Sequence, residues 1–139
     1  MKRKVFRNKN IFITGASSGI GYALALELAS QGANLILTAR RKDRLQELAQ
    51  KIQNRGAKAI TAVMDVTQKD DINNAIGKTH QEFGHINITI ANAAIPIHGN
   101  FEELTTDNYR RVFETNVFGV LNTSYACIDD LKKTKGSNH

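Results

Sequence analysis

Three glycines, Gly15, Gly19 and Gly21, lie between a short apolar run and a helical pattern, in an arrangement suited to holding phosphate. Residues 11–13 predict a strand, and the alanines and leucines of residues 23–29 predict a helix. Glycine lets the backbone approach an anion, and the first turn of a helix offers unpaired N–H groups and a positive dipole end. This order is typical of the phosphate end of a dinucleotide-binding βαβ unit, although an ordinary glycine-rich turn is the alternative.

The remaining residues of this turn, Ser17, Ser18 and Ile20, are predicted to lie against the same phosphates. Serine hydroxyls in front of a helix either cap it or contact an anion. Nothing around them resembles the sharp turn that exposes a nucleophilic serine. We also expect Gly21 to let the helix pack close to the sheet.

Arg40 and Arg41 stand about 20 residues after the glycines, at the position that separates NAD(H) from NADP(H) binding. An acidic residue there would bind a ribose 2′-hydroxyl, but the first acid is Asp43. A guanidinium instead suits a 2′-phosphate, which it can bind through two charge-assisted hydrogen bonds. The sequence therefore predicts NADP(H), with Arg40 as the main ligand and Arg41 as a weaker one. The alternative is that the arginines begin a solvated helix.

Polar or small residues also follow the third and fourth predicted strands. Asp65 can accept a hydrogen bond from an adenine amino group, and Val66 can pack on the ring. Asp65 could equally cap the helix that follows it. Asn92, Ala93 and Ala94 keep the backbone narrow beside a cofactor, although an asparagine at a strand end also stabilises turns.

The elements that position these residues alternate along the chain. The predicted strands cover residues 11–13, 34–39, 58–64 and 86–91, and helices separate them. Thr67 and Asp70 predict a capping box at the start of the third helix. We expect one α/β domain over residues 1–139, a Rossmann-type doubly wound parallel sheet in the order 3-2-1-4. Its ligand crevice lies at the carboxyl ends of the first and fourth strands.

These motifs together resemble those of the classical short-chain dehydrogenases/reductases. Residues 14–21, TGASSGIG, match the family's TGxxxGxG, and residues 91–94, ANAA, lie where the family has NNAG. The resemblance covers residues 9–136. It implies that Asp65 binds adenine and that Asn116 belongs to the catalytic Asn-Ser-Tyr-Lys tetrad. It also implies hydride transfer between NADP(H) and a small carbonyl or alcohol substrate.

Two departures from the family pattern bear on this expectation. Ala91 and Ala94 replace an asparagine and a glycine, and each adds a Cβ near the expected cofactor path. The family's catalytic serine and YxxxK would follow the last residues given, and none of Tyr22, Tyr109 and Tyr125 begins a YxxxK motif. We therefore expect a truncated or fragment oxidoreductase chain. The alternatives are a non-catalytic NADP(H)-binding module and a basic protein that interacts with nucleic acid.

Composition narrows the classes of protein. With 139 residues, 41% hydrophobic and 23% charged, the sequence suits a globular domain, and its one cysteine excludes an internal disulfide. The net charge of +6 is concentrated at both ends, which solvated termini explain, so no nucleic-acid partner is predicted. No apolar run approaches a membrane span, and we expect a cytoplasmic protein. The four histidines and Cys127 lack metal-ligand spacing, and no metal is predicted.

A long helix over residues 105–133 is the last predicted element, with Thr105 or Thr106 as its cap. Its helical spacing predicts a buried apolar face made of Tyr109, Val112, Phe113, Val117, Val120, Leu121 and Tyr125. In the resembled family this helix commonly forms subunit interfaces, which implies a possible homo-oligomer. The fourth strand would present an unpaired edge that also favours association.

Overall fold

The computed structural model describes residues 4–17 and 19–136, and its centre is a sheet of four parallel strands. These strands are β1 (Asn10–Thr14), β2 (Asn34–Ala39), β3 (Lys58–Val63) and β4 (Ile88–Ala91). Their order is β3-β2-β1-β4, which confirms the predicted topology. Thr14, the last residue of β1, pairs with Thr38 of β2 and with Ala91 of β4. The ends of the three strands therefore meet at one rim.

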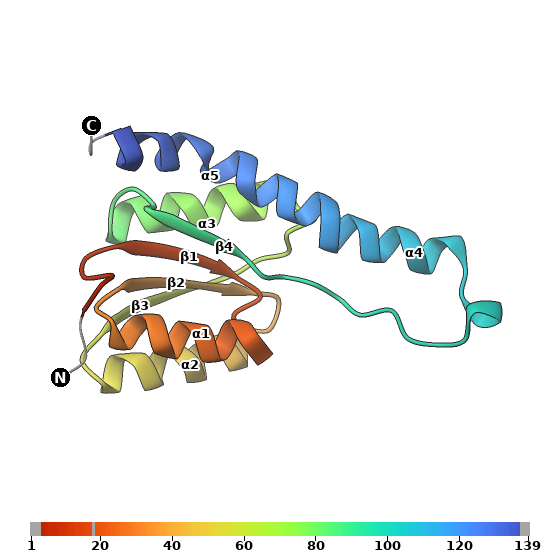
Figure 1. Cartoon of the computed structure of the whole chain (residues 1–139), viewed down its shortest axis with the longest axis horizontal. Coiled ribbons are helices and arrows are strands. Elements are labelled where there is room, and N and C mark those ends of the chain that lie inside the picture. The colour runs from red at the N-terminus through yellow and green to blue at the C-terminus, as the bar shows by residue number, and fades with distance from the viewer. Residues whose placement is uncertain (1–3, 18, 137–139) are drawn as a thin grey trace.

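Helices cover both faces of this sheet (Figure 1). The helices α1 (Gly19–Ser30) and α2 (Lys42–Asn54) lie on one face, and α3 (Lys69–Glu82) and α5 (Gly119–Gly136) lie on the other. A 3-10 turn (Phe101–Glu103), the helix α4 (Thr106–Phe113) and a π-helical segment (Glu114–Phe118) precede α5. The helix α4 and the chain segment that follows β4 both project beyond the carboxyl ends of the strands.

Two apolar cores hold the layers together because successive strand residues point to opposite faces. Ile11 and Ile13 of β1 pack with α1 and α2, whereas Phe12 between them packs with α3 and α5. All three side chains are fully buried, as expected for a parallel sheet covered on both faces. Cys127 lies in the second core, and burial raises the pKa of its thiol.

The start of α3 differs from the prediction. Its N-cap is Gln68, which makes no side-chain capping bond, so the capping box expected of Thr67 and Asp70 is wrong. The Thr67 hydroxyl instead donates to Asp65, and Asp71 accepts from the backbone N–H of Asp65. The polar residues that suggested a cap are used by the turn between β3 and α3.

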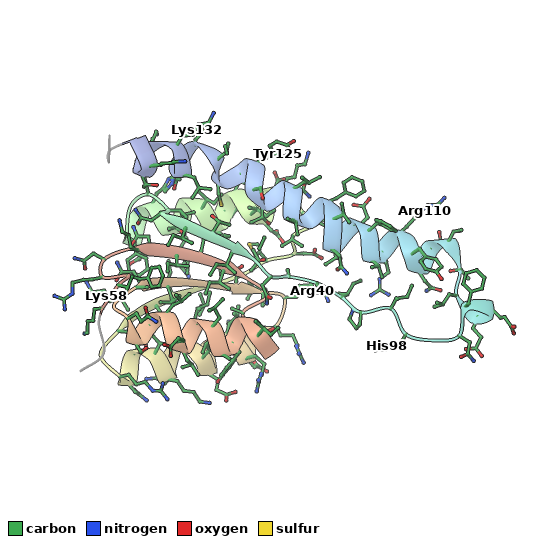
Figure 2. The ribbon with its side chains drawn as sticks, viewed as in Figure 1. Arg40, Lys58, His98, Arg110, Tyr125 and Lys132 are labelled. Atoms are coloured by element: carbon green, nitrogen blue, oxygen red, sulfur yellow. The ribbon has the colours of Figure 1, made fainter. Side chains whose placement is uncertain are left out.

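The long helix begins as predicted, since the Thr105 hydroxyl accepts from the N–H of Asn108 and the Asn108 side chain bonds back to Thr105. Its predicted buried face is wrong, since four of the seven residues are exposed and the other three are only partly buried. Tyr125 is 74% exposed and projects away from the sheet (Figure 2), and three more residues are exposed: Phe113, Val117 and Leu121. The side that faces the sheet and α3 carries Thr123, Cys127 and Asp130 instead. Helical spacing identified an apolar face, but a less apolar face is the one that packs.

Among the described residues, no helix combines the length and the apolar character needed to cross a membrane.

Candidate functional site

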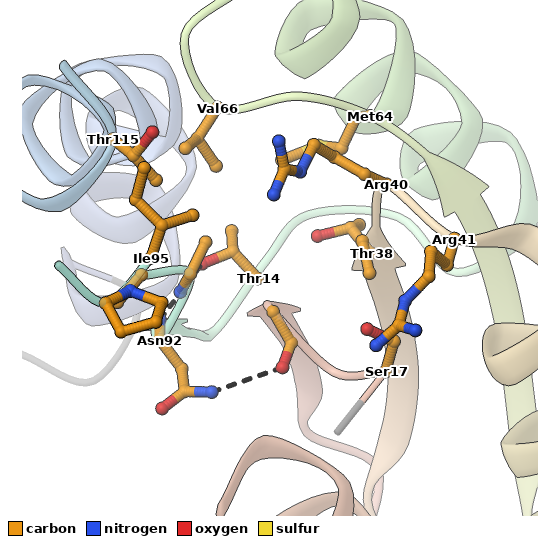
Figure 3. Close-up of a pocket in the computed structure, with 15 residues that line it drawn as sticks. Thr14, Ser17, Thr38, Arg40, Arg41, Met64, Val66, Asn92, Ile95 and Thr115 are labelled. Carbon is orange, nitrogen blue, oxygen red and sulfur yellow. Dashed lines mark hydrogen bonds between the residues drawn. The ribbon is translucent and has the colours of Figure 1, made fainter. Parts of the chain in front are cut away.

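A cavity of about 540 Å³ opens at the rim where β1, β2 and β4 end (Figure 3). It is the place predicted from the topology, because the chain reverses its winding direction between β1 and β4. Most of the residues predicted for cofactor binding line it: Gly15, Ser17, Arg40, Arg41, Val66, Asn92, Ala93 and Ala94. Residues far apart in the sequence thus meet in one hollow.

The glycine turn is packed tightly against the end of β4. Gly15 has a φ of +66°, and a Cβ on it would lie 2.8 Å from the Cα of Ala93. A Cβ on Gly21 would collide with the carbonyl oxygen of Gly15 and lie 2.6 Å from Nδ2 of Asn92. Gly21 therefore permits close packing as expected, but its neighbours are the turn and Asn92, which follows β4, and not the strands themselves. These two positions tolerate only glycine without a shift of backbone.

The other predicted residues of the turn lie differently. Gly19 has a φ of +58° with open space where a Cβ would be, so its conformation and not its surroundings favours glycine. Ile20 is 77% exposed at the start of α1. Ser18 lies outside the described residues. The Ser17 carbonyl accepts from Nε of Arg44, which attaches the turn to α2.

Thr14 connects the turn to β4 in a way that the sequence did not reveal. Its hydroxyl, which is almost fully buried, accepts from the backbone N–H groups of Asn92 and Ala93 at 2.9 and 3.0 Å. The Asn92 side chain donates in turn to the carbonyl of Gly15 at 3.2 Å. Asn92 therefore stabilises the turn, the simpler of its two predicted roles, while also lining the cavity.

Arg40 and Arg41 follow β2 directly and are both exposed at the cavity. In Figure 3 the Arg40 side chain extends toward Val66, whereas that of Arg41 turns toward Ser17. None of the described residues that line this cavity is acidic. The cavity thus offers two guanidinium groups and, among its described lining residues, no carboxylate, together with an apolar wall that includes Met64, Val66 and Ile95.

Asp65 does not line this cavity and is used locally. Its Oδ1 accepts from the backbone N–H of Thr67 at 2.9 Å and from the Thr67 hydroxyl at 2.7 Å. It lines a neighbouring hollow together with Arg40, between β3 and α4. The alternative predicted for Asp65 was capping of the helix that follows it, but the N-cap of α3 is Gln68, and Asp65 instead orders the turn before that helix.

Asn116 holds the segment that follows β4. Its Oδ1 accepts from the N–H of Ile95 at 2.8 Å, and its Nδ2 donates to the carbonyl of the same residue at 2.9 Å. Asn116 lies in the π-helical segment, and its neighbour Thr115 lines the cavity. The π-helical segment is thus joined to the cavity wall, because the Asn116 side chain bonds both the N–H and the carbonyl of Ile95.

A second polar cluster, at the opposite end of the sheet, was missed by the sequence analysis. His80 and His85 both contact the carboxylate of Asp130, which lies about 50 residues further along the chain. Burial acts to raise the pKa of Asp130, but hydrogen bonds from the Ile86 N–H and from His80 outweigh it, so this pKa is lowered. The only signal was the pair of histidines five residues apart, which is not a usual ligand spacing.

The sheet order, the glycine turn and the cavity at the carboxyl rim define a Rossmann-type α/β protein. The chain belongs to the short-chain dehydrogenase family, whose model matches residues 9–138. Members of this family bind nicotinamide cofactors, and the resemblance noted in the sequence is confirmed.

Individual relatives support the same assignment. The chain is 39% identical over 116 residues to an uncharacterised oxidoreductase of Listeria monocytogenes, an alignment of 84% of this chain and 47% of that protein. An alcohol dehydrogenase from the archaeon Thermococcus sibiricus, complexed with 5-hydroxy-NADP, has a TM-score of 0.85 and 35% identity over 91% of this chain and 54% of that one.

An NAD+-bound xylitol dehydrogenase has a TM-score of 0.87 at 25% identity, over 93% of this chain and 50% of that one. The similar structures therefore include complexes with both types of nicotinamide cofactor. The chain spans about half the length of these relatives, whose full length includes further sequence.

Proposed function

We propose that these 139 residues form the NADP(H)-binding half of an oxidoreductase of the short-chain dehydrogenase type. The observation that carries this proposal is the pair Arg40 and Arg41 at the cavity, with no acid among the described residues that line it. A carboxylate at the end of β2 would favour a free ribose hydroxyl, whereas two guanidinium groups favour a phosphate. The proposal is therefore NADP(H) in preference to NAD(H).

The residues present fit such a cofactor. The Gly15 turn and the start of α1 supply backbone N–H groups for the pyrophosphate, and Arg40 and Arg41 would hold the 2′-phosphate. Val66 and Met64 form an apolar wall suited to a base, and Ala93 and Ala94 keep the path along β4 narrow. When bound, the nicotinamide supplies hydride exchange with a carbonyl or alcohol carbon.

In this proposal Asn116 acts on the site through Ile95, because both of its amide atoms bond the backbone of that residue. The proton exchange at the substrate oxygen is assigned to the rest of the protein, since no described tyrosine lines the cavity. A small carbonyl or alcohol substrate and a cytoplasmic location belong to the proposal for the whole protein. A non-catalytic NADP(H)-binding module stays the alternative.

Arg40→Ala should weaken NADPH binding by about 10- to 100-fold, the equivalent of losing a charge-assisted contact worth roughly 1.5–3 kcal/mol. NADH binding should stay within about twofold, because NADH has no 2′-phosphate. Titration of the nicotinamide fluorescence measures the dissociation constants for NADPH and for NADH on the same samples. Arg41→Ala should show the same selectivity with a smaller loss.

The matched control is Arg55→Ala, which removes an exposed arginine at the other end of the sheet. It tests whether the loss reflects the general positive charge of the chain, and it should leave both constants unchanged. Equal weakening of NADPH and NADH by Arg40→Ala, or an NADH affinity above that for NADPH in the unchanged chain, would contradict the proposal.

The exposed apolar side of the long helix supports a second proposed property, association of two copies. Six large apolar side chains are 41–74% exposed there: Phe113, Val117, Phe118, Leu121, Tyr125 and Ile128. Exposed apolar side chains gathered on one helix are characteristic of interaction sites when they form a patch. The proposed association would use this apolar side, which α4, the π-helical segment and α5 share.

Tyr125→Glu should shift the chain from dimer to monomer, with a dimer dissociation constant raised at least about tenfold, because a charge would be buried at the contact. Light scattering after size-exclusion chromatography measures the mass over a range of concentrations. Lys132→Glu, an exposed charge change on the same helix, is the control and should have little effect. A monomeric unchanged chain at high concentration would refute the association.

A further inference from the structure

A cluster of metal-ligating side chains lies at the amino end of the sheet, away from the cavity. His80 belongs to the last turn of α3, His85 to the loop before β4, and Asp130 to α5. Figure 1 shows that these elements converge at the end of the sheet opposite α4. Neither the proposed cofactor nor the glycine turn involves this cluster, so the inference is independent of the proposed function.

Asp130 is the fixed member of the cluster. The residue is 5% exposed, and its Oδ2 accepts from the backbone N–H of Ile86 at 2.8 Å. A buried carboxylate is costly unless polar partners surround it, and here the backbone N–H of Ile86 and the two imidazoles are those partners. Helix α5 therefore presents an oriented carboxylate toward the loop that leads into β4.

Both histidines converge on this carboxylate from the solvent side. Nε2 of His80 lies 2.7 Å from Oδ2, and Nδ1 of His85 lies 3.3 Å from Oδ1. The centroids of the two rings are 5.1 Å apart, and the rings are edge to face at an interplanar angle of 77°. Their side chains are 40% and 49% exposed, which leaves the outer side open to ions and water.

We propose that His80, His85 and Asp130 form a binding site for a divalent transition metal ion such as Zn²⁺, with water completing the coordination. The donor atoms of the three residues lie within 4.8 Å of one another. In a tetrahedral zinc site with bonds of about 2.1 Å, donor atoms are about 3.4 Å apart. Small side-chain rotations would therefore bring one nitrogen from each ring and one carboxylate oxygen to coordinating distance.

The donor chemistry selects the class of ion. Two imidazole nitrogens and one carboxylate oxygen suit zinc, cobalt or nickel, whereas Mg²⁺ and Ca²⁺ prefer sites made of oxygen. The N–H of Ile86 orients the carboxylate from behind, as outer hydrogen bonds do in metal sites. The competing explanation is a histidine–aspartate ion pair that binds no metal, and it predicts no response to added ions.

The test uses the full chain after treatment with a chelator and exhaustive dialysis. Isothermal titration calorimetry with ZnCl₂ should show one bound ion per chain, and MgCl₂ should give no comparable heat. Co²⁺ should produce the visible absorption of a tetrahedral site with nitrogen and oxygen ligands. His80→Gln, His85→Gln and Asp130→Asn should each weaken zinc binding at least about tenfold.

His98→Gln is the matched control because His98 is an exposed histidine on the segment after β4, far from the cluster (Figure 2). It should bind zinc as the unchanged chain does. Circular dichroism checks the fold of each variant, and if Asp130→Asn unfolds the chain, the two exposed histidine variants decide the question. Absence of zinc binding, or unchanged affinity in folded His80→Gln and His85→Gln, would overturn the proposal.

Discussion

Gly21→Ala should lower the free energy of unfolding by about 2 kcal/mol, although alanine is the better helix former. Alanine gains about 1 kcal/mol over glycine inside a helix. The added Cβ, however, collides with the Gly15 carbonyl and lies 2.6 Å from the Asn92 side chain. Overpacking of this kind costs about 3 kcal/mol when backbone must move, so the steric cost exceeds the gain. Urea unfolding followed by circular dichroism measures the difference.

The same substitution should weaken NADPH binding at least about tenfold, because the displaced Gly15 turn is the proposed phosphate site. Gly77→Ala is the matched control, since Gly77 lies within α3 and a Cβ there meets nothing within 4 Å. The control should raise stability by up to about 1 kcal/mol and leave binding unchanged. If Gly21→Ala and Gly77→Ala were stabilised alike, the inference that Gly21 packs closely on the turn would be wrong.

Thr14→Val should destabilise the chain by about 3 kcal/mol, although valine has nearly the shape of threonine. The substitution removes the acceptor of two backbone N–H groups, those of Asn92 and Ala93. An unpaired buried polar group costs about 1–3 kcal/mol, and two are created here. A chain of this length should lose roughly 10 °C of melting temperature, which differential scanning calorimetry measures.

Thr14→Ser is the control for this prediction, because serine keeps the hydroxyl and loses only a methyl group. It should cost about 1 kcal/mol, well below the loss expected for Thr14→Val. Amide exchange at Asn92 and Ala93 should be faster in Thr14→Val than in Thr14→Ser. Similar stabilities of the two variants would show that the hydroxyl does not hold the end of β4.

Several parts of this protein followed from local pattern. The second strand was predicted at residues 34–39 and is observed as Asn34–Ala39, because a largely apolar run lies between a glycine turn and two arginines. The sheet order followed from the handedness of parallel crossovers. The order in turn placed Arg40, Val66 and Asn92 at one rim, since parallel strands end together.

The roles of polar side chains within the site did not follow from pattern. Asp65 and Asn92 were predicted with two possible roles each, and both make local hydrogen bonds, to Thr67 and to the Gly15 carbonyl. Thr14 passed unnoticed because its two partners lie 78 and 79 residues away. A hydroxyl or carboxylate can bond whatever the fold brings near, and residue type does not say which partner that is.

The long helix and the histidine cluster likewise show that sequence pattern does not identify which parts of the chain come into contact. Spacing alone predicted that Tyr125 is buried, yet Thr123, Cys127 and Asp130 face the sheet and α3. The sequence determined the glycine turn, the strands, their order and the cations at the rim, because these depend on local backbone preference and chain direction. Only the tertiary structure decided which helix face packs and that Asp130 meets His80 and His85, because those contacts depend on how separate elements are juxtaposed.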